Sequence, residues 1–175
     1  RALAPASPTR GTREPGLAAT GWFDTEHMAY PYGVHLAVVR VDTGTGQVII
    51  ERFLVAYDIG RAINPMLVHG QITGGVAQGI GGALLEEFVY DADGVPAATT
   101  LADYLLPTAT DVPPIEVLLA EDAPSPRNPL GIKGAGEAGI NGVGAAIASA
   151  VDDAIGKPGA VTRLPLTPER VLRLL

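Results

Sequence analysis

The stretch that decides the fold reads VHLAVVRVDTGTGQVIIERFLVA over residues 34–56. Its two apolar, β-branched runs, 34–41 and 48–56, flank a short segment that contains two glycines. Such a pattern is typical of a β-hairpin. The second run continues into Asp58-Ile59-Gly60 and then Ile63-Asn64-Pro65, where glycine and proline end the strand and turn the chain. We therefore expect a helix to begin soon afterwards.

The apolar spacing becomes helical from Met66 to Phe88, and one flank of this helix is predicted to be buried through Val76, Ile80 and Ala83/Leu84. The opposite face is nearly bare: at about 100° per residue, it collects Gly74, Gln78, Gly81 and Gly82. A glycine inside a helix costs about 1 kcal/mol relative to alanine. Either another helix or a ligand must therefore approach this backbone closely. Gln78 favours a polar ligand, because a lone amide packed against apolar atoms would lack partners.

Weaker patterns mark the rest of the chain. We expect a turn at 91–94, a short extended segment at 101–106, a strand at 115–120 and a loop at 124–129. A second helix is predicted over 142–155, with Asn141 as N-cap, Gly156 and Pro158 as the stop, and a core stripe of Val143, Ile147, Ala150/Val151 and Ala154. A final short helix should start at Thr167-Pro168 and bury Val171, Leu172 and Leu175. The predicted fold class is α+β, an antiparallel hairpin or sheet with packed helices.

A glycine cluster, GIKGAGEAG over residues 131–139, precedes the second helix. Glycine-rich loops that lead into a helix suit anions, because free backbone N–H groups and the helix dipole point at the ligand. Lys133 is not followed by the serine or threonine of a phosphate-binding P-loop. Residues 134–139 do satisfy G-x-G-x-x-G, but a dinucleotide site also needs a strand leading into its first glycine, and prolines occupy that approach.

Glu137 is unexpected in a loop suited to anions. One explanation is a general base, which a desolvated pocket would strengthen and whose charge Lys133, four residues earlier, would offset or position. The alternative is a surface glutamate, or a carboxylate that interacts favourably with the start of the helix. The residues alone leave both readings open.

Composition excludes several classes of function. A formal charge of −7 argues against non-specific nucleic-acid binding. No apolar run is long enough to span a membrane, and no signal-peptide pattern is visible. The absence of cysteine excludes disulfides, thiolate zinc sites and Cys-ligated iron–sulfur clusters in this chain. The three histidines, His27, His35 and His69, are not closely spaced, so no histidine-rich metal site is expected.

Three stretches carry a family resemblance: VAYDIGRAINPMLVHGQITGGVAQGIGGALLEE from Val55, DYLLPTATDVP from Asp103, and NPLGIKGAGEAGINGVGAAIASAVDDAI from Asn128. In this order they resemble the large subunits of molybdenum hydroxylases, the family that includes xanthine dehydrogenase, aldehyde oxidoreductase and aerobic carbon monoxide dehydrogenase. The resemblance implies that residues 21–175 are the C-terminal, incomplete portion of a molybdopterin-binding domain. Residues 1–20 are expected to be a disordered or linker-like head.

The resemblance also implies roles for individual residues. Glu137 is similar to the base that takes a proton from a molybdenum-bound hydroxyl, while hydride passes from the substrate carbon to a sulfido ligand. Gln78 resembles a glutamine near the pterin and the metal's ligands. The remaining expected cofactor-binding residues are Gln71, Gly74, Gly75 and Gly79, with Lys133, Gly134, Ala135 and Gly136 as the loop that passes the metal centre. No protein ligand to molybdenum is expected.

The implied activity is oxidative hydroxylation of an aldehyde, heteroaromatic or similar small substrate, with water as oxygen donor. The expected cofactor is molybdenum–molybdopterin cytosine dinucleotide, with iron–sulfur and FAD subunits as partners and a cytoplasmic, alternatively periplasmic, location. Family subunits are several times longer, so this piece alone is expected to expose apolar surface and to be inactive. The alternatives are a truncated remnant that acts as a structural or interaction module, and a dinucleotide-binding domain.

Overall fold

A computed structural model describes residues 19–175 of the chain. The predicted head, residues 1–20, lies outside the described residues up to residue 18. The hairpin is confirmed: β1 (Tyr32–Val41) pairs antiparallel with β2 (Val48–Asp58), with a register shift between Val38 and Val39. Asp42 organises its turn, since the carboxylate accepts hydrogen bonds from the backbone N–H groups of Gly44 and Thr45.

The third strand, β3 (Ile115–Ala120), confirms the strand predicted at these residues. It pairs with β2 in parallel, Phe53 lying opposite Ile115, so the sheet is mixed, with strand order β1-β2-β3, and is not wholly antiparallel. The reason is the connection: between β2 and β3 the chain passes through a long helix, and such a crossover returns it in the same direction.

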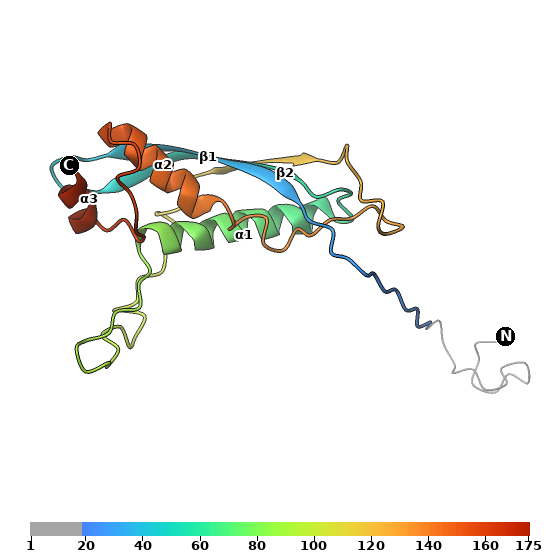
Figure 1. Cartoon of the computed structure of the whole chain (residues 1–175), viewed down its shortest axis with the longest axis horizontal. Helices are drawn as coiled ribbons and strands as arrows, with labels where there is room; N and C mark the ends of the chain where they lie inside the picture. Colours follow the sequence, from blue (N-terminus) through green and yellow to red (C-terminus); the bar gives the residue numbers. More distant parts are fainter. Residues whose placement is uncertain (1–18) are drawn as a thin grey trace, which may run out of the picture.

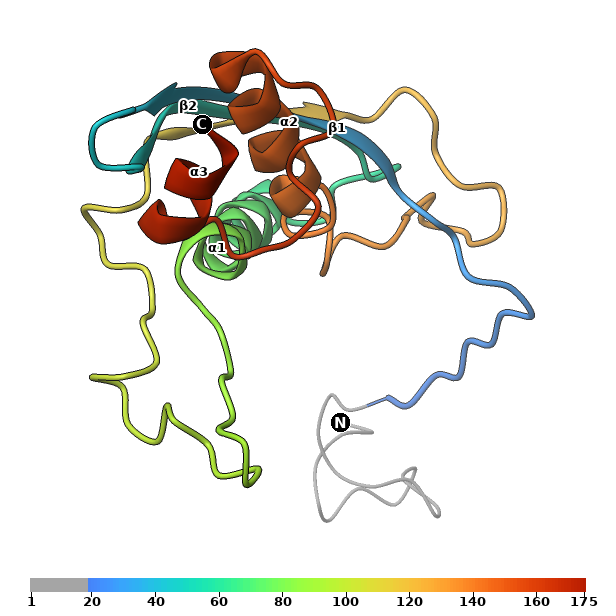
Figure 2. The same ribbon diagram turned by 60° about the vertical axis from the view of Figure 1, so that its left-hand side comes forward.

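Three helices complete the predicted α+β fold: α1 (Pro65–Leu84), α2 (Val143–Ile155) and α3 (Pro168–Leu174). Figure 1 and Figure 2 show α1 and α2 on the same side of the sheet. The α1 N-cap is Asn64, whose side chain accepts a hydrogen bond from the N–H of Leu67, and the helix ends four residues before the predicted Phe88. No helix within residues 19–175, the 20-residue α1 included, is both long and apolar enough to cross a membrane.

The caps of α2 and α3 test the boundary predictions. Gly156 ends α2 in the left-handed conformation, as predicted, and the Thr167 side chain caps α3 by accepting from the N–H of Arg170. The prediction of Asn141 as the α2 cap is wrong. Gly142 holds that position without a side-chain hydrogen bond, because the preceding turn already winds into the helix.

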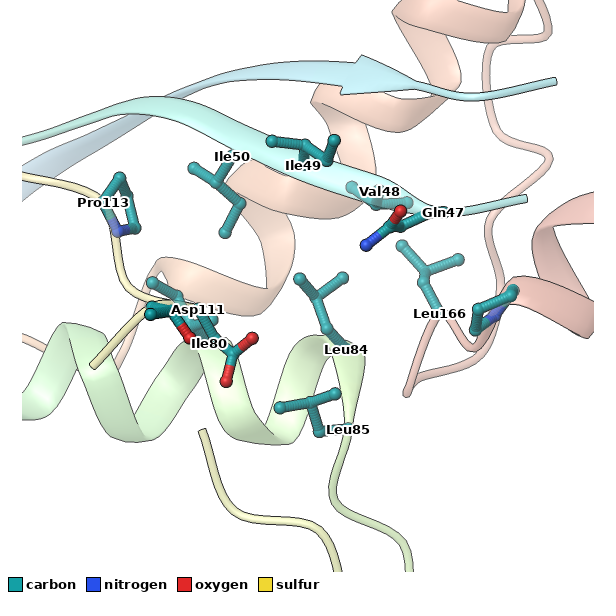
Figure 3. Close-up of a pocket in the computed structure, with 12 residues that line it drawn as sticks. Gln47, Val48, Ile49, Ile50, Ile80, Leu84, Leu85, Asp111, Pro113 and Leu166 are labelled. Carbon is teal, nitrogen blue, oxygen red and sulfur yellow. The ribbon is translucent and has the colours of Figure 1, made fainter. Parts of the chain in front are cut away.

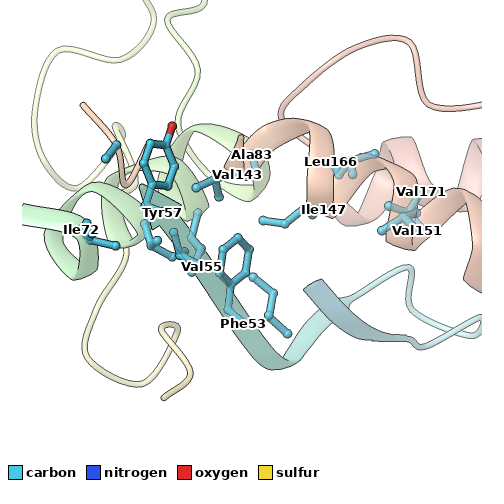
Figure 4. Close-up of a cluster of buried hydrophobic side chains, with 14 of the residues drawn as sticks. Phe53, Val55, Tyr57, Ile72, Ala83, Val143, Ile147, Val151, Leu166 and Val171 are labelled. Atoms are coloured by element: carbon cyan, nitrogen blue, oxygen red, sulfur yellow. The ribbon is translucent and has the colours of Figure 1, made fainter. Parts of the chain in front are cut away.

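The core lies between the sheet and the helices (Figure 4). It contains Phe53, Val55 and Tyr57 from β2, Ile72, Val76, Ile80 and Ala83 from α1, Val143, Ile147 and Val151 from α2, and Leu166 and Val171. The predicted burial of Leu172 and Leu175 is wrong: they are 43% and 42% exposed, since only one side of the seven-residue α3 reaches the core. Ala154, also predicted on the core stripe, is exposed.

Residues 85–114 form a long connection that projects away from the sheet and the helices (Figures 1 and 2). The segment predicted as extended, 101–106, begins instead with a turn. The Thr100 side chain stabilises this turn by accepting from the N–H of Ala102 and donating to Asp103. The chain then returns past a cavity between the hairpin turn and the end of α1, lined by Gln47, Leu84, Asp111 and Leu166 among others (Figure 3).

The sheet face opposite the helices carries exposed apolar side chains, among them Val34, Leu36 and Leu118. Apolar surface is therefore exposed in this chain, as predicted for a piece of a longer subunit.

Replacing Ile147 with alanine tests the core. Ile147 is fully buried, so Ile147→Ala should lower the free energy of unfolding by about 2–5 kcal/mol, as measured by urea denaturation. Leu118→Ala is the control, because Leu118 is 57% exposed and its loss removes little packing. Similar losses for the two variants would contradict the arrangement of sheet and helices.

Candidate functional site

The glycine-rich loop is fastened to the end of β2. Gly60 and Ile132 form an antiparallel bridge, in which the Lys133 N–H donates to the carbonyl of Ile59 at 2.9 Å. Gly60 has φ of 66°, and a Cβ there would lie 2.2 Å from the Gly131 carbonyl oxygen. Only glycine therefore permits this contact between the two segments.

Asn128 closes the loop on itself. Its side chain donates to the Ile132 carbonyl at 2.8 Å and accepts from the Ile132 N–H at 2.9 Å. The Gly131 carbonyl accepts from the N–H groups of Arg61 and Ser125. The backbone of 128–133 is thus held by hydrogen bonds on both sides.

The Lys133 side chain turns back toward the sheet. Its Nζ donates to Asp58 Oδ2 at 2.7 Å, lies 5.5 Å from the centroid of the Tyr32 ring, and belongs to a side chain that is 11% exposed. The expectation that Lys133 offsets the charge of Glu137 is therefore wrong. The ammonium group of Lys133 pairs with Asp58, an acidic residue at the end of β2.

The ion pair has a defined dependence on pH. The hydrogen bond from Lys133, and then that from the Gly60 N–H, lower the pKa of Asp58. Because the folded-state pKa is lowered, the pair stabilises the fold above about pH 4, and this contribution is lost as pH falls through the folded-state value.

Glu137 lies in the turn over residues 136–142 that leads into α2, and it is exposed. The salt bridges found within residues 19–175 do not include it. Its carbonyl accepts from the Ile140 N–H at 3.2 Å, which tightens the turn. The carboxylate is therefore free to meet a group from outside this chain.

One side of α1 packs on this turn. A Cβ on Gly75 would lie 2.9 Å from the Gly139 Cα, one on Gly79 would lie 2.6 Å from the Val143 Cβ, and one on Gly139 would lie 2.2 Å from the Ile72 carbonyl oxygen. Gln71 adds a hydrogen bond from Nε2 to the Gly136 carbonyl at 3.4 Å. Gly75 and Gly79, expected at a cofactor surface, allow close packing within the chain.

Another side of α1 is bare. Added Cβ atoms at Gly70, Gly74 and Gly82 would meet nothing within 4 Å, and Gln78 is exposed on the same side. We call Gly70, Gly74, Gln78 and Gly82 the bare strip. Gly81, predicted on this face, is buried beneath Glu86 and Pro107, because the chain folds back as it leaves the helix. Close packing, one of the two alternatives offered by the sequence, thus accounts for one side of α1, and the bare strip lies on another side.

The loop residues expected to pass a cofactor lie at the end of α1 that carries Gln71. Gly134 and Gly136 are exposed, whereas Ala135 is half-buried and packs against the core. The Gly134 N–H is used within the chain, since it donates to the Ala29 carbonyl at 3.0 Å. No strand leads into Gly134 in the described part of the chain, so the dinucleotide-binding alternative lacks the element that it requires.

Sequence reasoning missed three residues that shape the site. Asp58 and Asn128 lie within the stretches that carry the family resemblance, but only the fold reveals their partners. His35 lies beneath the turn, its ring edge-on to Tyr57, and both ring nitrogens are buried without a hydrogen-bond partner. Burial lowers the pKa of His35, which favours the neutral ring.

An added methyl group should have opposite effects where the turn packs on α1 and on the bare strip of α1. Gly139→Ala, which would clash with the α1 backbone, should lower the free energy of unfolding by about 1–3 kcal/mol or more. Gly74→Ala should raise it by about 1 kcal/mol, since alanine favours the helix and meets no neighbour. Urea denaturation measures both. Destabilisation by Gly74→Ala would show that the strip is not open.

Known proteins resemble this chain over most of its length. The family model described as "Molybdopterin cofactor-binding domain" matches residues 3–113. The 6-hydroxypseudooxynicotine dehydrogenase complex subunit gamma of Paenarthrobacter nicotinovorans is 51% identical over 158 residues, which are 90% of this chain and 20% of that protein. The carbon monoxide dehydrogenase large chain of Hydrogenophaga pseudoflava is 40% identical and is matched by 93% of this chain over 20% of its own length.

Solved structures also resemble this chain. Quinoline 2-oxidoreductase from Pseudomonas putida 86 aligns with a TM-score of 0.75 and 46% identity, over 81% of this chain and 18% of that chain. A Cu,Mo-CO dehydrogenase aligns with a TM-score of 0.84 and 32% identity, over 95% of this chain and 21% of that chain. The chain thus spans about a fifth of the length of these relatives. By sequence and by fold, it belongs to the molybdopterin cofactor-binding domain family of molybdenum hydroxylase large subunits.

Proposed function

We propose that this chain is the C-terminal part of the large subunit of a molybdenum hydroxylase, with Glu137 as the general base. The reaction is the oxidative hydroxylation of an aldehyde, a heteroaromatic compound or a similar small substrate, with water as oxygen donor. The relatives' names support this range of substrates, because they include carbon monoxide dehydrogenase and quinoline 2-oxidoreductase.

The observation that carries the proposal is the bare strip of α1. Helix-interior glycine is unfavourable, and the packing of this chain does not require it at Gly74, where a side chain would meet nothing. A flat, side-chain-free backbone next to the turn that carries Glu137 suits a large planar group lying along the helix. The exposed Gln78 amide, which both donates and accepts, suits the polar edge of such a group.

These residues fit molybdopterin. Gly74 and Gln78 would lie against the pterin from α1, and the backbone of Lys133, Gly134, Ala135 and Gly136 would pass the metal end. Gln71 would hold this loop through the Gly136 carbonyl. Gly75 and Gly79 would act indirectly, by letting the turn approach α1. When bound, the cofactor supplies the two-electron redox chemistry and the activation of water.

Glu137 performs the proton transfer in this proposal. A carboxylate oxygen accepts the proton released from the water-derived hydroxyl as its oxygen attacks the substrate carbon. The carboxylate suits this task because no salt bridge of residues 19–175 engages it. Surrounding parts of the subunit would exclude water and so strengthen the base.

The rest of the enzyme is proposed from the same family membership. The cofactor is the cytosine dinucleotide form, and the protein is cytoplasmic. Electrons leave through iron–sulfur and FAD subunits. This chain has no cysteine with which to ligate iron–sulfur clusters itself, and the word "subunit" in the name of one relative supports a multi-subunit assembly. The isolated chain is inactive, because most of the subunit is missing from it.

Glu137→Gln tests the base. In the complete large subunit with its partner subunits, the variant should keep its molybdenum content while kcat on an aldehyde and heteroaromatic panel falls by about 10²–10⁴-fold. Glu169→Gln is the control, since Glu169 is an exposed residue of α3. Normal turnover by Glu137→Gln would refute the assigned role, and failure of the complete wild-type protein to bind molybdenum would favour the inactive-module alternative.

Gly74→Ala tests the cofactor surface. The added methyl group stands where the proposal places the pterin, so the purified enzyme should hold several-fold less molybdopterin, although the helix itself gains stability. Metal and pterin analysis measure this. Ala154→Ser, which also adds one heavy atom to an exposed helix position, is the control. Full cofactor content in Gly74→Ala would show that the bare strip is not part of the cofactor-binding surface.

A further inference from the structure

The Asp58–Lys133 ion pair connects the end of β2 with the loop that leads to Glu137. The two residues are 75 positions apart in sequence, and their side chains are only 19% and 11% exposed. The ion pairs on the outer side of the same sheet, Arg52–Glu116 and Arg40–Glu51, have side chains that are about half exposed or more. Partial burial of a charge pair costs solvation, and the short contact with Lys133 and the hydrogen bond from the Gly60 N–H offset that cost at Asp58.

The ion pair lies inside a rigid corner. The Asp58 Oδ1 accepts from the Gly60 N–H at 2.8 Å while Oδ2 accepts from Lys133. The backbone bonds from Lys133 to Ile59 and from Arg61 to Gly131 bind the same two segments together. Position 133 is therefore fixed to the sheet through both its backbone and its side chain.

Only three residues separate this corner from Glu137. The turn is held against α1 by the Gln71 hydrogen bond to Gly136 and, beyond Glu137, by the close packing of Gly139 on Ile72. Glu137 thus lies between two attachment points, one on the sheet and one on α1. A shift at the first point would move the carboxylate, and displacement of a reacting group by about 1 Å costs up to about 100-fold in rate.

The ion pair also separates charges. Lys133 and Glu137 are the only charged residues in 128–142. A lysine released from Asp58 has a flexible four-carbon stem and would be free to pair with the nearby carboxylate. Such pairing would stabilise the ionised carboxylate and weaken it as a base.

We infer that Asp58 is a positioning residue for the reaction: by binding Lys133, it fixes the loop that carries Glu137 and keeps the lysine ammonium away from that carboxylate. The inference rests on the proposed function, because it assigns Asp58 a role only if Glu137 is the base.

The test compares Asp58→Asn, Asp58→Glu, Lys133→Met and the double variant Asp58→Asn/Lys133→Met in the complete large subunit with its partners. Molybdenum content, thermal midpoint, kcat and KM are measured for each. Asp58→Asn and Lys133→Met should lower kcat by about 10- to 100-fold per bound molybdenum, with little change in KM. Asp58→Glu keeps the charge and should recover most of kcat. The double variant should be no worse than the single ones, because both remove the same interaction.

Glu116→Gln is the matched control, because it breaks an exposed ion pair on the outer side of the sheet and should leave kcat unchanged. A normal kcat in Asp58→Asn, with only a lower thermal midpoint, would reduce the pair to a structural role and overturn the inference. The inference would also be overturned if Asp58→Asn lost activity only in proportion to the molybdenum that it lost. If Asp58→Asn fails to fold, Lys133→Met tests the positioning of the loop from the other partner, and an unchanged kcat in that variant overturns the inference.

Glu137→Gln, assayed in parallel, distinguishes failure of the proposed function from failure of the inference about Asp58. If it turns over normally, the proposed function fails, and the inference fails with it. If it is inactive while Asp58→Asn is fully active, the proposed function stands and only the inference is rejected.

Discussion

The close approach of α1 to the turn over residues 136–142 is the constraint on which the rest of the structure depends. Gly75 and Gly139 bring two backbones into contact, and Gly79 makes room for Val143 at the start of α2. Because α2 also packs on β1, this contact sets the position of both helices over the sheet. A side chain larger than hydrogen at Gly139 would separate the layers and move the turn that carries Glu137.

The same helix meets two different requirements through its glycines. On the side of Gly75 and Gly79, small size is used by the chain's own packing. On the side of Gly74, it is left unused within the chain. The sequence alone does not distinguish these two kinds of glycine. Only the atoms around each position show whether a glycine is needed for packing within the chain or leaves room for a bound molecule. This distinction connects the fold to the proposed cofactor surface.

Much of the fold could be predicted from the sequence, because periodicity reports local burial. The hairpin, α1, β3, α2 and the α3 cap each follow from patterns within one segment. What could not be predicted depends on where distant segments meet. Lys133 is four residues from Glu137 in sequence, yet its partner is Asp58, 75 residues away. The burial of Gly81, the exposure of Leu172 and the parallel pairing of β3 likewise depend on tertiary placement.

The contacts that assemble the site span long stretches of chain: 65 residues separate Gln71 from Gly136, and 75 separate Asp58 from Lys133. Contacts between distant residues require large loops to close, which slows their formation. The hairpin closes over a six-residue connection and can form early. The loop beside α1 is therefore expected to order after the hairpin as the chain folds. A surface that needs this loop and α1 together is therefore complete only after the β1–β2 hairpin has formed.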